Sequence, residues 1–400
     1  MFQNEKGDIY LESKIVSIEL TPVHVPFKEL IRETMEKGGG LGMAIPAEEV
    51  WLGGDFVICK LFAEDGTFGL GEAFVWLPET GILPETIINI IKHALHRYVV
   101  GENPFHIEKI LQKMDNNVAR NHVAKGLIDI ACYDLMGKLK GKPACELMSD
   151  HTVNEIPLAA LIPLADTETL VMLAKMFYKL NYKTFRYKLG TGIDEDVKVS
   201  EVIRDTLGTS VRIRVDYNQA YTPEEAVQAI KAIEPFNIDL AEQPVRADDF
   251  VGMAYVQKRV DTPLMMHEGF FSLQDFYTLV ELKAVGVLGV NSERPGGVTN
   301  ALKAIDYAVK CGMGTVIHNQ PLGIASAMHI HLAAAKYNAL GHAPELFGHI
   351  MMEDDLIVTS LNYDKGIAKV PSGPGWGVKL NEKALEKYAT GPTLTIGKSP

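Results

Sequence analysis

The sequence predicts an α/β protein: a modified (β/α) barrel of the TIM type, preceded by an α+β capping domain. From about residue 153 onward, eight short apolar, strand-like runs alternate with helical patterns. The chain has 400 residues, which is enough for a barrel and a second domain. The strand-like runs also end on polar side chains, as the strands of such barrels do at the active-site face.

The first part of the chain predicts the capping domain, which we place at residues 1–140. Strand patterns at 13–27 and 56–76 are followed by helical patterns between residues 84 and 141. Strands followed by a group of helices are typical of an α+β domain. The connection over residues 28–54 is polar, glycine-rich and long, which is typical of a disordered segment or a functional loop.

The barrel is predicted over residues 141–360. Its strand-like runs lie at 155–163, 183–190, 211–218, 238–245, 263–270, 285–293, 314–322 and 344–350. Helical patterns separate most of them, at 168–180, 223–236, 272–284, 298–312 and 325–337. This alternation indicates a parallel sheet with right-handed crossovers. A doubly wound open sheet is the alternative, and it is disfavoured because no GxGxxG motif follows the first strand.

Composition narrows the classes of partner. The net charge is −12 with acidic and basic residues interspersed, so nucleic acid is not an expected partner. The four cysteines, Cys59, Cys132, Cys145 and Cys311, are scattered without metal-binding spacing and suit a reducing compartment. The polar start lacks a secretory signal, and no run of about 18 uncharged apolar residues exists. We therefore expect a cytoplasmic protein without a membrane partner.

Polar residues at the ends of the strand-like runs predict the site. In a (β/α) barrel these ends converge on one mouth. They are Arg186 and Lys188; Asp216 and Asn218; Glu242 and Gln243; His267 and Glu268; Asn291, Glu293 and Arg294; His318 and Asn319; and Glu345. We expect the functional residues among them.

Three of these residues, Asp216, Glu242 and Glu268, are carboxylates spaced 26 residues apart. The spacing matches one strand–helix unit, so neighbouring strands are expected to present them at similar height. Three converging carboxylates repel one another unless a cation neutralises them, and hard oxygen ligands suit Mg²⁺, with Mn²⁺ as the alternative. Each acid alone could instead cap a helix or pair with a surface lysine, but the regular spacing favours a metal site.

Two further residues are candidates for proton transfer. Lys188 lies on the strand before the one that carries Asp216. The nearby positive charges of Arg186 and a metal ion would favour the neutral, basic form of this lysine. Its alternative role is charge compensation. His318 ends the seventh strand, across the mouth from Lys188, whereas His329 and His331 fall within a helix and are expected to be packing or surface residues.

As a set, these segments resemble the mandelate racemase and muconate lactonizing enzyme branch of the enolase superfamily. The resemblance covers nearly the whole chain and rests on "YKLG", "VDYNQ", "EQP", the acid in "HEG", "ERPGGVTNALK", "ELFG" and "VPSGPGWGVKLNEKALEKY". The last segment resembles the family ending that returns to the capping domain, so residues 361–400 are expected to do so.

The resemblance implies removal of a proton α to a carboxylate, giving an enolate that the metal stabilises. It implies that Asp216, Glu242 and Glu268 are the metal ligands and Lys188 is the base. It also implies that Glu345 lies near the substrate, and that the remaining strand-end residues bind substrate or support the site. Those residues are Asn218, Gln243, His267, Asn291 and Arg294. Loops near 28–50 and 74–84 would cover the mouth, with Met43, Ile45 and Trp51 as candidate apolar walls.

Departures from the family pattern affect the proton-transfer residues. The family's lysine strand usually reads KxK, whereas here Arg186 takes the first position and cannot exchange protons. Arg294 stands where muconate lactonizing enzymes have a second lysine. Asn291 stands where members with a seventh-strand histidine have an aspartate that orients it. His318 is then expected to be a weaker base than usual and better suited to delivering a proton.

The sequence favours an isomerase, meaning a racemase, epimerase or cycloisomerase, that acts on a small carboxylic acid. A lyase that removes a β-hydroxyl after the same first step is the alternative, as in acid-sugar dehydratases. A barrel that binds a metal and a carboxylate without turnover is the third hypothesis. We also expect a homo-oligomer, because barrels with such capping domains often assemble.

Overall fold

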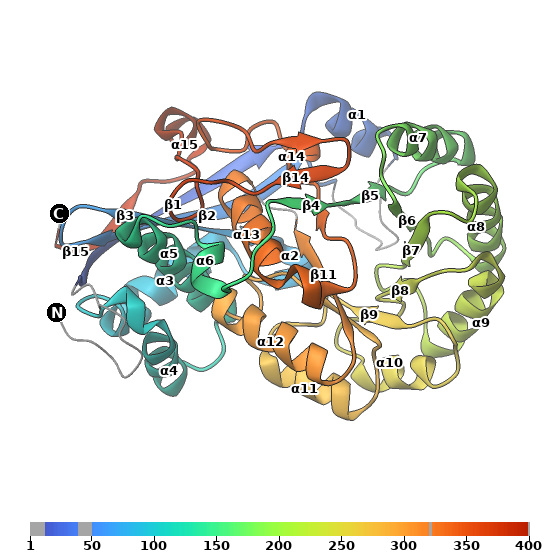
Figure 1. Cartoon of the computed structure of the whole chain (residues 1–400), viewed down its shortest axis with the longest axis horizontal. Coiled ribbons are helices and arrows are strands. Elements are labelled where there is room, and N and C mark those ends of the chain that lie inside the picture. Colours follow the sequence, from blue (N-terminus) through green and yellow to red (C-terminus); the bar gives the residue numbers. More distant parts are fainter. Residues whose placement is uncertain (1–12, 39–49, 320–321, 399–400) are drawn as a thin grey trace.

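The computed structural model describes residues 13–38, 50–319 and 322–398. The N-terminal part contains an antiparallel sheet in the order β15-β1-β2-β3. Its strands are β1 (Ile15–Pro26), β2 (Gly53–Ala63), β3 (Phe68–Val75) and β15 (Leu394–Gly397). Because β15 comes from the end of the chain and pairs with β1, the C-terminal segment returns to this sheet, as Figure 1 shows on its left side.

Helices cover one face of this sheet. They include α3 (Pro84–His93), α4 (Ile107–Asn117) and α5 (His122–Lys140), where helical patterns predict them. Nearly all of α5 is buried, and it packs tightly on β3. A Cβ atom on Gly69 would lie 2.1 Å from the carbonyl oxygen of Ala131, so this close approach requires glycine.

The second part is a nearly closed barrel of eight parallel strands, which confirms the predicted fold class. The sheet order runs from β5 to β12 in sequence. The strands are β5 (Ala159–Ile162), β6 (Thr184–Lys188), β7 (Arg212–Asp216), β8 (Leu240–Glu242), β9 (Leu264–Met266), β10 (Val287–Val290), β11 (Gly314–Asn319) and β12 (Glu345–Leu346). Between β5 and β12, the backbone N–H of Ala159 donates to the carbonyl of Pro344 at 2.9 Å.

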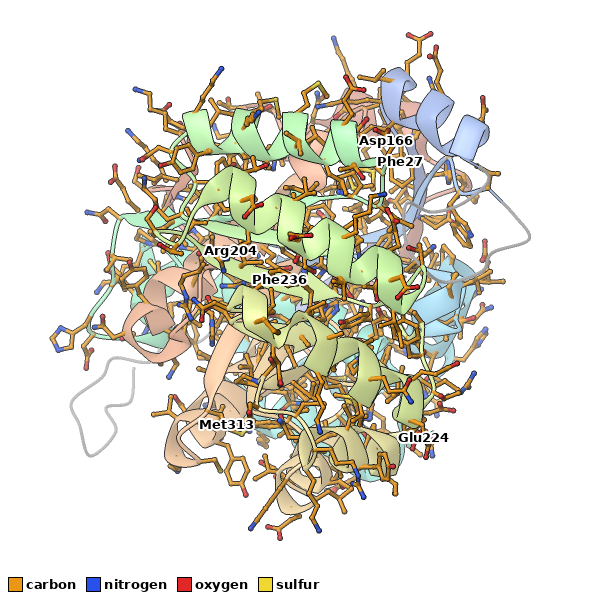
Figure 2. The ribbon with its side chains drawn as sticks, turned by 90° about the vertical axis from the view of Figure 1, so that its right-hand side faces the viewer. Phe27, Asp166, Arg204, Glu224, Phe236 and Met313 are labelled. Atoms are coloured by element: carbon orange, nitrogen blue, oxygen red, sulfur yellow. The ribbon has the colours of Figure 1, made fainter. Side chains whose placement is uncertain are left out.

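Helices surround the barrel (Figures 1 and 2). They are α7 (Thr167–Lys179), α8 (Ile193–Leu207), α9 (Pro223–Ile233), α10 (Phe250–Gln257), α11 (Leu273–Glu281), α12 (Val298–Lys310) and α13 (Gly323–Leu340). The helical patterns above did not include α8 and α10. The apolar residues Val199, Ile203 and Leu207 of α8 recur at every fourth position and carry a signal, whereas α10 has only eight residues without helical periodicity.

The first predicted barrel strand is divided in two. Residues 155–157 form β4 (Glu155–Pro157), which pairs with β14 (Ile367–Lys369) in a small separate sheet, and only β5 belongs to the barrel. Pro157 has no N–H to donate to a strand ladder, which disfavours it in a central strand.

Buried side chains fill the barrel interior. Leu240, Met265, Val287 and Val316 form a buried cluster of their own, apart from the core between strands and helices. Their neighbours Ala241, Leu264 and Met266 belong to that outer core. Because side chains alternate along a strand, positions two residues after the interior cluster also face inward. The alternation therefore decides which residues reach the mouth.

The capping sheet and the barrel are joined by a buried carboxylate. Glu72 of β3 accepts backbone N–H groups of Leu322, Ile324 and Ala325 at the start of α13, at 2.6, 3.2 and 3.1 Å. These donors have no partner within the helix, and the helix dipole favours a negative group there.

Among the described helices, none combines the length and apolar character needed to cross a bilayer.

Candidate active site

Three side chains of the site lie in one row across neighbouring strands. Lys188 of β6 is in register with Asp216 of β7, which is in register with Glu242 of β8. Lys188 Nζ donates to Asp216 Oδ2 at 2.6 Å and also contacts Asn218 Oδ1. The predicted common height of the first two carboxylates is therefore observed, and both are completely buried.

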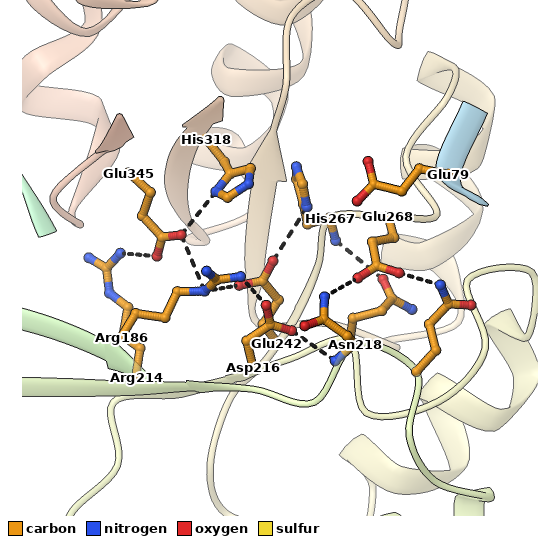
Figure 3. A network of polar contacts seen from close by, with 12 residues as sticks. Glu79, Arg186, Arg214, Asp216, Asn218, Glu242, His267, Glu268, His318 and Glu345 are labelled. Carbon is orange, nitrogen blue, oxygen red and sulfur yellow. Dashed lines mark hydrogen bonds and ion pairs between the residues drawn. The ribbon is translucent and has the colours of Figure 1, made fainter. Parts of the chain in front are cut away.

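Arg186 and Arg214 lie one layer deeper on the same inward face. Arg186 contacts Asp216, and its Nε lies 2.9 Å from Glu242 Oε2 and 3.3 Å from Glu345 Oε2. Arg214 Nη1 donates to Glu345 Oε1 at 3.1 Å. Figure 3 shows Arg186 among these carboxylates. The guanidinium groups thus provide part of the positive charge that the buried acids require.

The backbone at the ends of β7 and β8 is unusual. Asn218, Gln219 and Gln243 have positive φ values of 41°, 66° and 39°, a region that side-chain-bearing residues seldom adopt. Such conformations concentrate at functional sites and require support from their surroundings. Here they direct the Asn218 and Gln219 amides to Glu268: Asn218 Nδ2 donates to Oε1 at 2.7 Å, and Gln219 Nε2 contacts Oε2.

Glu242 and Glu268 differ from Asp216 in the direction in which the protein shifts their pKa values. Burial opposes ionisation of Asp216, but Arg186 and Lys188 outweigh it and lower the pKa of this carboxyl. Burial raises the pKa of Glu242 well above its ordinary value, although Arg186 opposes the change. Burial, with the nearby charges of Glu79 and Asp216, raises the pKa of Glu268 to about 7. An ionised Glu242 or Glu268 is therefore costly without a further cation.

His318 lies on the other side of the mouth, with Glu345 as its partner. Its Nδ1 is 3.0 Å from Glu345 Oε2, and the two residues are in register on β11 and β12. Burial lowers the pKa of His318 to about 4, although the bond to Glu345 opposes this. The imidazole is therefore neutral near pH 7. The carboxylate that orients it is Glu345, whereas the family pattern led us to consider Asn291 in that role.

The remaining predicted residues surround this centre. His267 packs edge-on against His318, with ring centroids 4.1 Å apart, and burial lowers its pKa well below the ordinary value. Gln243 donates to the carbonyl of Val245 at 3.0 Å and supports the end of β8. Asn291 directly follows β10 and is buried. Arg294 contacts Glu79 instead of the carboxylate row.

The Arg294 contact brings the capping domain to the mouth. Glu79 lies in α2 (Leu77–Thr80), inside the segment 74–84 that we expected to cover the site. Trp51 packs edge-on against Trp76, with ring centroids 5.9 Å apart. Met43 and Ile45 lie outside the described residues. The sequence did not predict the helix α1 (Glu29–Gly38), which occupies part of the long connection over residues 28–54.

Sequence reasoning missed three residues of the network. Arg214 precedes Asp216 by two positions on one strand, so alternation could have placed it in the interior. Gln219 is part of the "VDYNQ" segment but was not assigned a role. Glu79 carries no recognisable signal, because it reaches the mouth from another domain.

The donor set fits a divalent cation. Among the described residues around the mouth, Asp216, Glu242, Glu268 and Glu345 face the basic side chains of Arg186, Lys188 and Arg214, which leaves an excess of negative charge. Oε1 of Glu242 is buried without a hydrogen-bond partner among them. Within the described ranges, however, no three His, Cys, Asp or Glu side chains are already close enough to hold an ion. Binding would therefore have to exchange the Arg186 contacts for contacts to the ion.

A lysine and a histidine that flank buried carboxylates, in a barrel with an antiparallel capping sheet, define an enolase-type enzyme. Comparison with known proteins agrees. Residues 169–384 match the family described as Enolase C-terminal domain-like, and residues 52–149 match the Mandelate racemase / muconate lactonizing enzyme, N-terminal domain. The chain belongs to the mandelate racemase and muconate lactonizing enzyme branch of the enolase superfamily. Members of this branch use a divalent metal ion.

Similar proteins of known activity are isomerases. The chain is 32% identical to an N-succinyl-L-Arg/Lys racemase of Bacillus cereus over 83% of this chain and 89% of that protein. It is 34% identical to a hydrophobic dipeptide epimerase of Enterococcus faecalis over 71% and 80%. The racemase crystal structure superposes with a TM-score of 0.85 at 29% identity, covering 96% of this chain and all of that one. The chain is an isomerase of this superfamily.

Proposed function

We propose that the protein racemises or epimerises an N-acylated amino acid or a dipeptide, by removing and returning the proton α to its carboxylate. The observation that carries the proposal is the placement of Lys188 and His318 on two sides of the carboxylate row, on β6 and β11. The substrate class is supported by the names of the relatives, which act on N-succinyl amino acids and dipeptides.

The proposal includes a divalent cation, Mg²⁺ or Mn²⁺, held by Asp216, Glu242 and a residue that follows β9. A solved dipeptide epimerase of Enterococcus faecalis, with a TM-score of 0.82 and 28% identity, contains Mg and the dipeptide L-Leu-L-Tyr. It covers 92% of this chain and 99% of its own. When bound, such an ion polarises a substrate carboxylate and stabilises the negative charge that develops on it.

The protein's own residues would move the proton. His318, neutral and held at Nδ1 by Glu345, can accept the α-proton on its side, and the imidazolium that forms is stabilised by the adjacent carboxylate. Lys188 donates hydrogen bonds to Asp216 and Asn218 and can return a proton to the opposite face. For the other stereoisomer the roles reverse, so Lys188 acts as the base, which is the role that the resemblance implies for it.

The test is exchange of the α-proton, followed by proton NMR in D₂O with Mg²⁺ or Mn²⁺. The panel would contain N-succinyl amino acids, dipeptides, sugar acids and hydroxy acids. We expect wild type to exchange and epimerise one class. His318→Asn and Lys188→Met should each retain exchange with only one of the two stereoisomers and lose epimerisation by at least a hundredfold, since each variant retains one of the two proton-transfer groups.

Three outcomes would contradict the proposal. Epimerisation that survives in both variants would remove Lys188 and His318 from the mechanism. A product that has lost a β-substituent would make the protein a lyase. Ion binding without exchange of any acid in the panel would favour a binding protein.

A second test addresses the cation. Glu242→Gln should lower Mg²⁺ and Mn²⁺ affinity at least tenfold in calorimetry while the fold persists, because losing one buried acid relieves repulsion among those that remain. Glu224→Gln, a change at an exposed position on α9, is the matched control. Unchanged affinity in Glu242→Gln would contradict a cation site in this row.

A further inference from the structure

The strand that follows the carboxylate row, β9, ends at Met266 and is followed directly by two polar residues, His267 and Glu268. We propose that His267, instead of Glu268, completes the cation site with Asp216 and Glu242. The site then favours a divalent ion that accepts nitrogen ligands, such as Co²⁺ or Mn²⁺, over Mg²⁺. This inference rests on the proposed function, because it specifies the third ligand of the same site.

The first support is the alternation of side chains in the barrel. Glu242 is in register with Met265, and Met265 lies in the interior cluster with Leu240. Two residues after Met265 comes His267, which continues the inward series just as Glu242 follows Leu240. Glu268 lies in the turn after the strand, so alternation does not set its direction, and it contacts Asn218 and Gln219.

The second support is the contact between His267 and Glu242. His267 Nδ1 lies 3.4 Å from Glu242 Oε1, yet Oε1 has no hydrogen-bond partner among the described residues. Both side chains are buried. Two adjacent ligand atoms of an octahedral ion, each at about 2.1 Å from it, lie about 3 Å apart. The pair is therefore spaced like two ligands of one ion that do not bond to each other.

The third support is that Glu268 already has partners. Each of its two oxygens receives an amide hydrogen, from Asn218 and from Gln219. Asn218 in turn accepts from Lys188 through its Oδ1. Glu268 therefore acts as a positioning residue, which fixes the carboxamide that holds the Lys188 ammonium.

The chemistry of the ligands sets the preference of the site. Mg²⁺ is a hard ion that selects oxygen donors and keeps several waters, whereas an imidazole nitrogen suits transition-metal ions. A site with two carboxylates and one imidazole should therefore bind Co²⁺ and Mn²⁺ more tightly than Mg²⁺. Asp216 is shared with Arg186, so the ion must compete with the guanidinium for that carboxylate.

The experiment uses the full-length protein after treatment with a chelator. Calorimetry would measure the affinity for Co²⁺, Mn²⁺ and Mg²⁺, and pulsed electron paramagnetic resonance of the Mn²⁺-loaded protein would detect a directly bound nitrogen. We expect wild type to bind Co²⁺ at least tenfold more tightly than Mg²⁺ and to show nitrogen modulation. His267→Asp should remove the modulation and bring the two affinities within threefold of each other, because an oxygen donor replaces the imidazole.

Glu268→Gln is the matched variant. We expect it to retain the nitrogen modulation and Co²⁺ affinity within threefold of wild type, while the rate of proton transfer by Lys188 falls. The inference is overturned if the modulation is missing in wild type, or if Glu268→Gln loses ion binding and His267→Asp leaves affinity and preference unchanged. Circular dichroism would establish that each variant is folded.

Failure of this inference can be distinguished from failure of the proposed function. If Glu242→Gln abolishes binding but His267→Asp has no effect, the cation site stands and only its third ligand is wrong. If Glu242→Gln binds all three ions like wild type, the site itself is wrong, and the assignment of His267 fails with it.

Discussion

At the level of single residues, Arg186 decides the charge balance of the mouth. Its guanidinium contacts Asp216, Glu242 and Glu345, and all four side chains are buried. Arginine remains charged at any accessible pH and spreads its charge over several donors, so it can serve three carboxylates together. A lysine at this position would offer a single point charge. The arginine that replaces the first lysine of the family's KxK pattern therefore provides contacts to all three carboxylates.

This role predicts the effect of Arg186→Met. The variant leaves buried carboxylates without their main counter-charge, and breaking a buried ion pair in this way costs about 3–5 kcal/mol. We expect the free energy of unfolding, measured with urea in a chelator, to fall by about this amount. Mn²⁺ should restore part of it, because the ion supplies the missing positive charge. Arg246→Met, whose pair with Asp248 is exposed, is the control and should change little.

A loss that Mn²⁺ does not reduce would contradict this account, since it would mean that Arg186 contributes packing instead of charge. Unchanged stability in the chelator would contradict the charge balance itself.

Much of the site was predictable at this level, for a physical reason. Converging strand ends place polar residues together, so Lys188, Asp216, Glu242, His318 and Glu345 were found from the sequence. The sequence did not show contacts that depend on which face of a strand a residue occupies. It also did not show contacts made by a residue of the other domain. The equal spacing of Glu268 suggested a third residue of the row, yet β9 ends at Met266, so spacing alone could not show which of its last residues faces inward.

At the level of secondary structure, the connection after β7 shows how a strand end becomes a site. The strand finishes at Asp216, Asn218 and Gln219 take left-handed conformations, and α9 begins at Pro223. Thr222 caps this helix: its hydroxyl accepts from the N–H of Glu225, and Glu225 Oε2 accepts the backbone N–H of Thr222 at 3.0 Å. The "TPEEA" segment has the residue types of a capping box, which satisfy the free N–H groups of the first turn.

Thr222→Ala should therefore destabilise the protein by about 1 kcal/mol, the usual cost of a lost N-cap. Thr222→Ser keeps the hydroxyl and should remain within a few tenths of a kcal/mol of wild type. Chemical denaturation would compare the three proteins. Equal destabilisation by alanine and serine would show that the threonine methyl group, and not the cap, contributes the stability.

At the level of the whole molecule, a buried histidine connects the barrel, the C-terminal segment and the capping domain. His331 of α13 accepts the N–H of Cys145 at Nδ1, and its Nε2 lies 3.2 Å from the carbonyl of Trp376. The indole of Trp376 donates to the carbonyl of Leu70 in β3 at 3.1 Å. The sequence indicated only a packing or surface role for His331, because these partners lie far away along the chain.

This connection predicts a pH dependence of stability. Burial lowers the pKa of His331 to about 4, although the bond to Trp376 opposes the change, while the unfolded chain has the ordinary value near 6.5. Below pH 6.5 the unfolded state binds a proton that the folded state excludes, so the contribution of His331 is complete above pH 6.5 and is lost as the pH falls towards 4.

The difference amounts to about 1.4 kcal/mol per pH unit, or roughly 2 kcal/mol at pH 5. His331→Gln keeps a donor and an acceptor but cannot titrate. Measured by urea unfolding at pH 7 and pH 5, the stability of wild type relative to His331→Gln should therefore fall by about 2 kcal/mol between the two values. His93→Gln, at an exposed position on α3, should follow wild type at both. If the curves for wild type and His331→Gln remained parallel, the histidine would be able to protonate in the folded state, and burial would not hold it neutral.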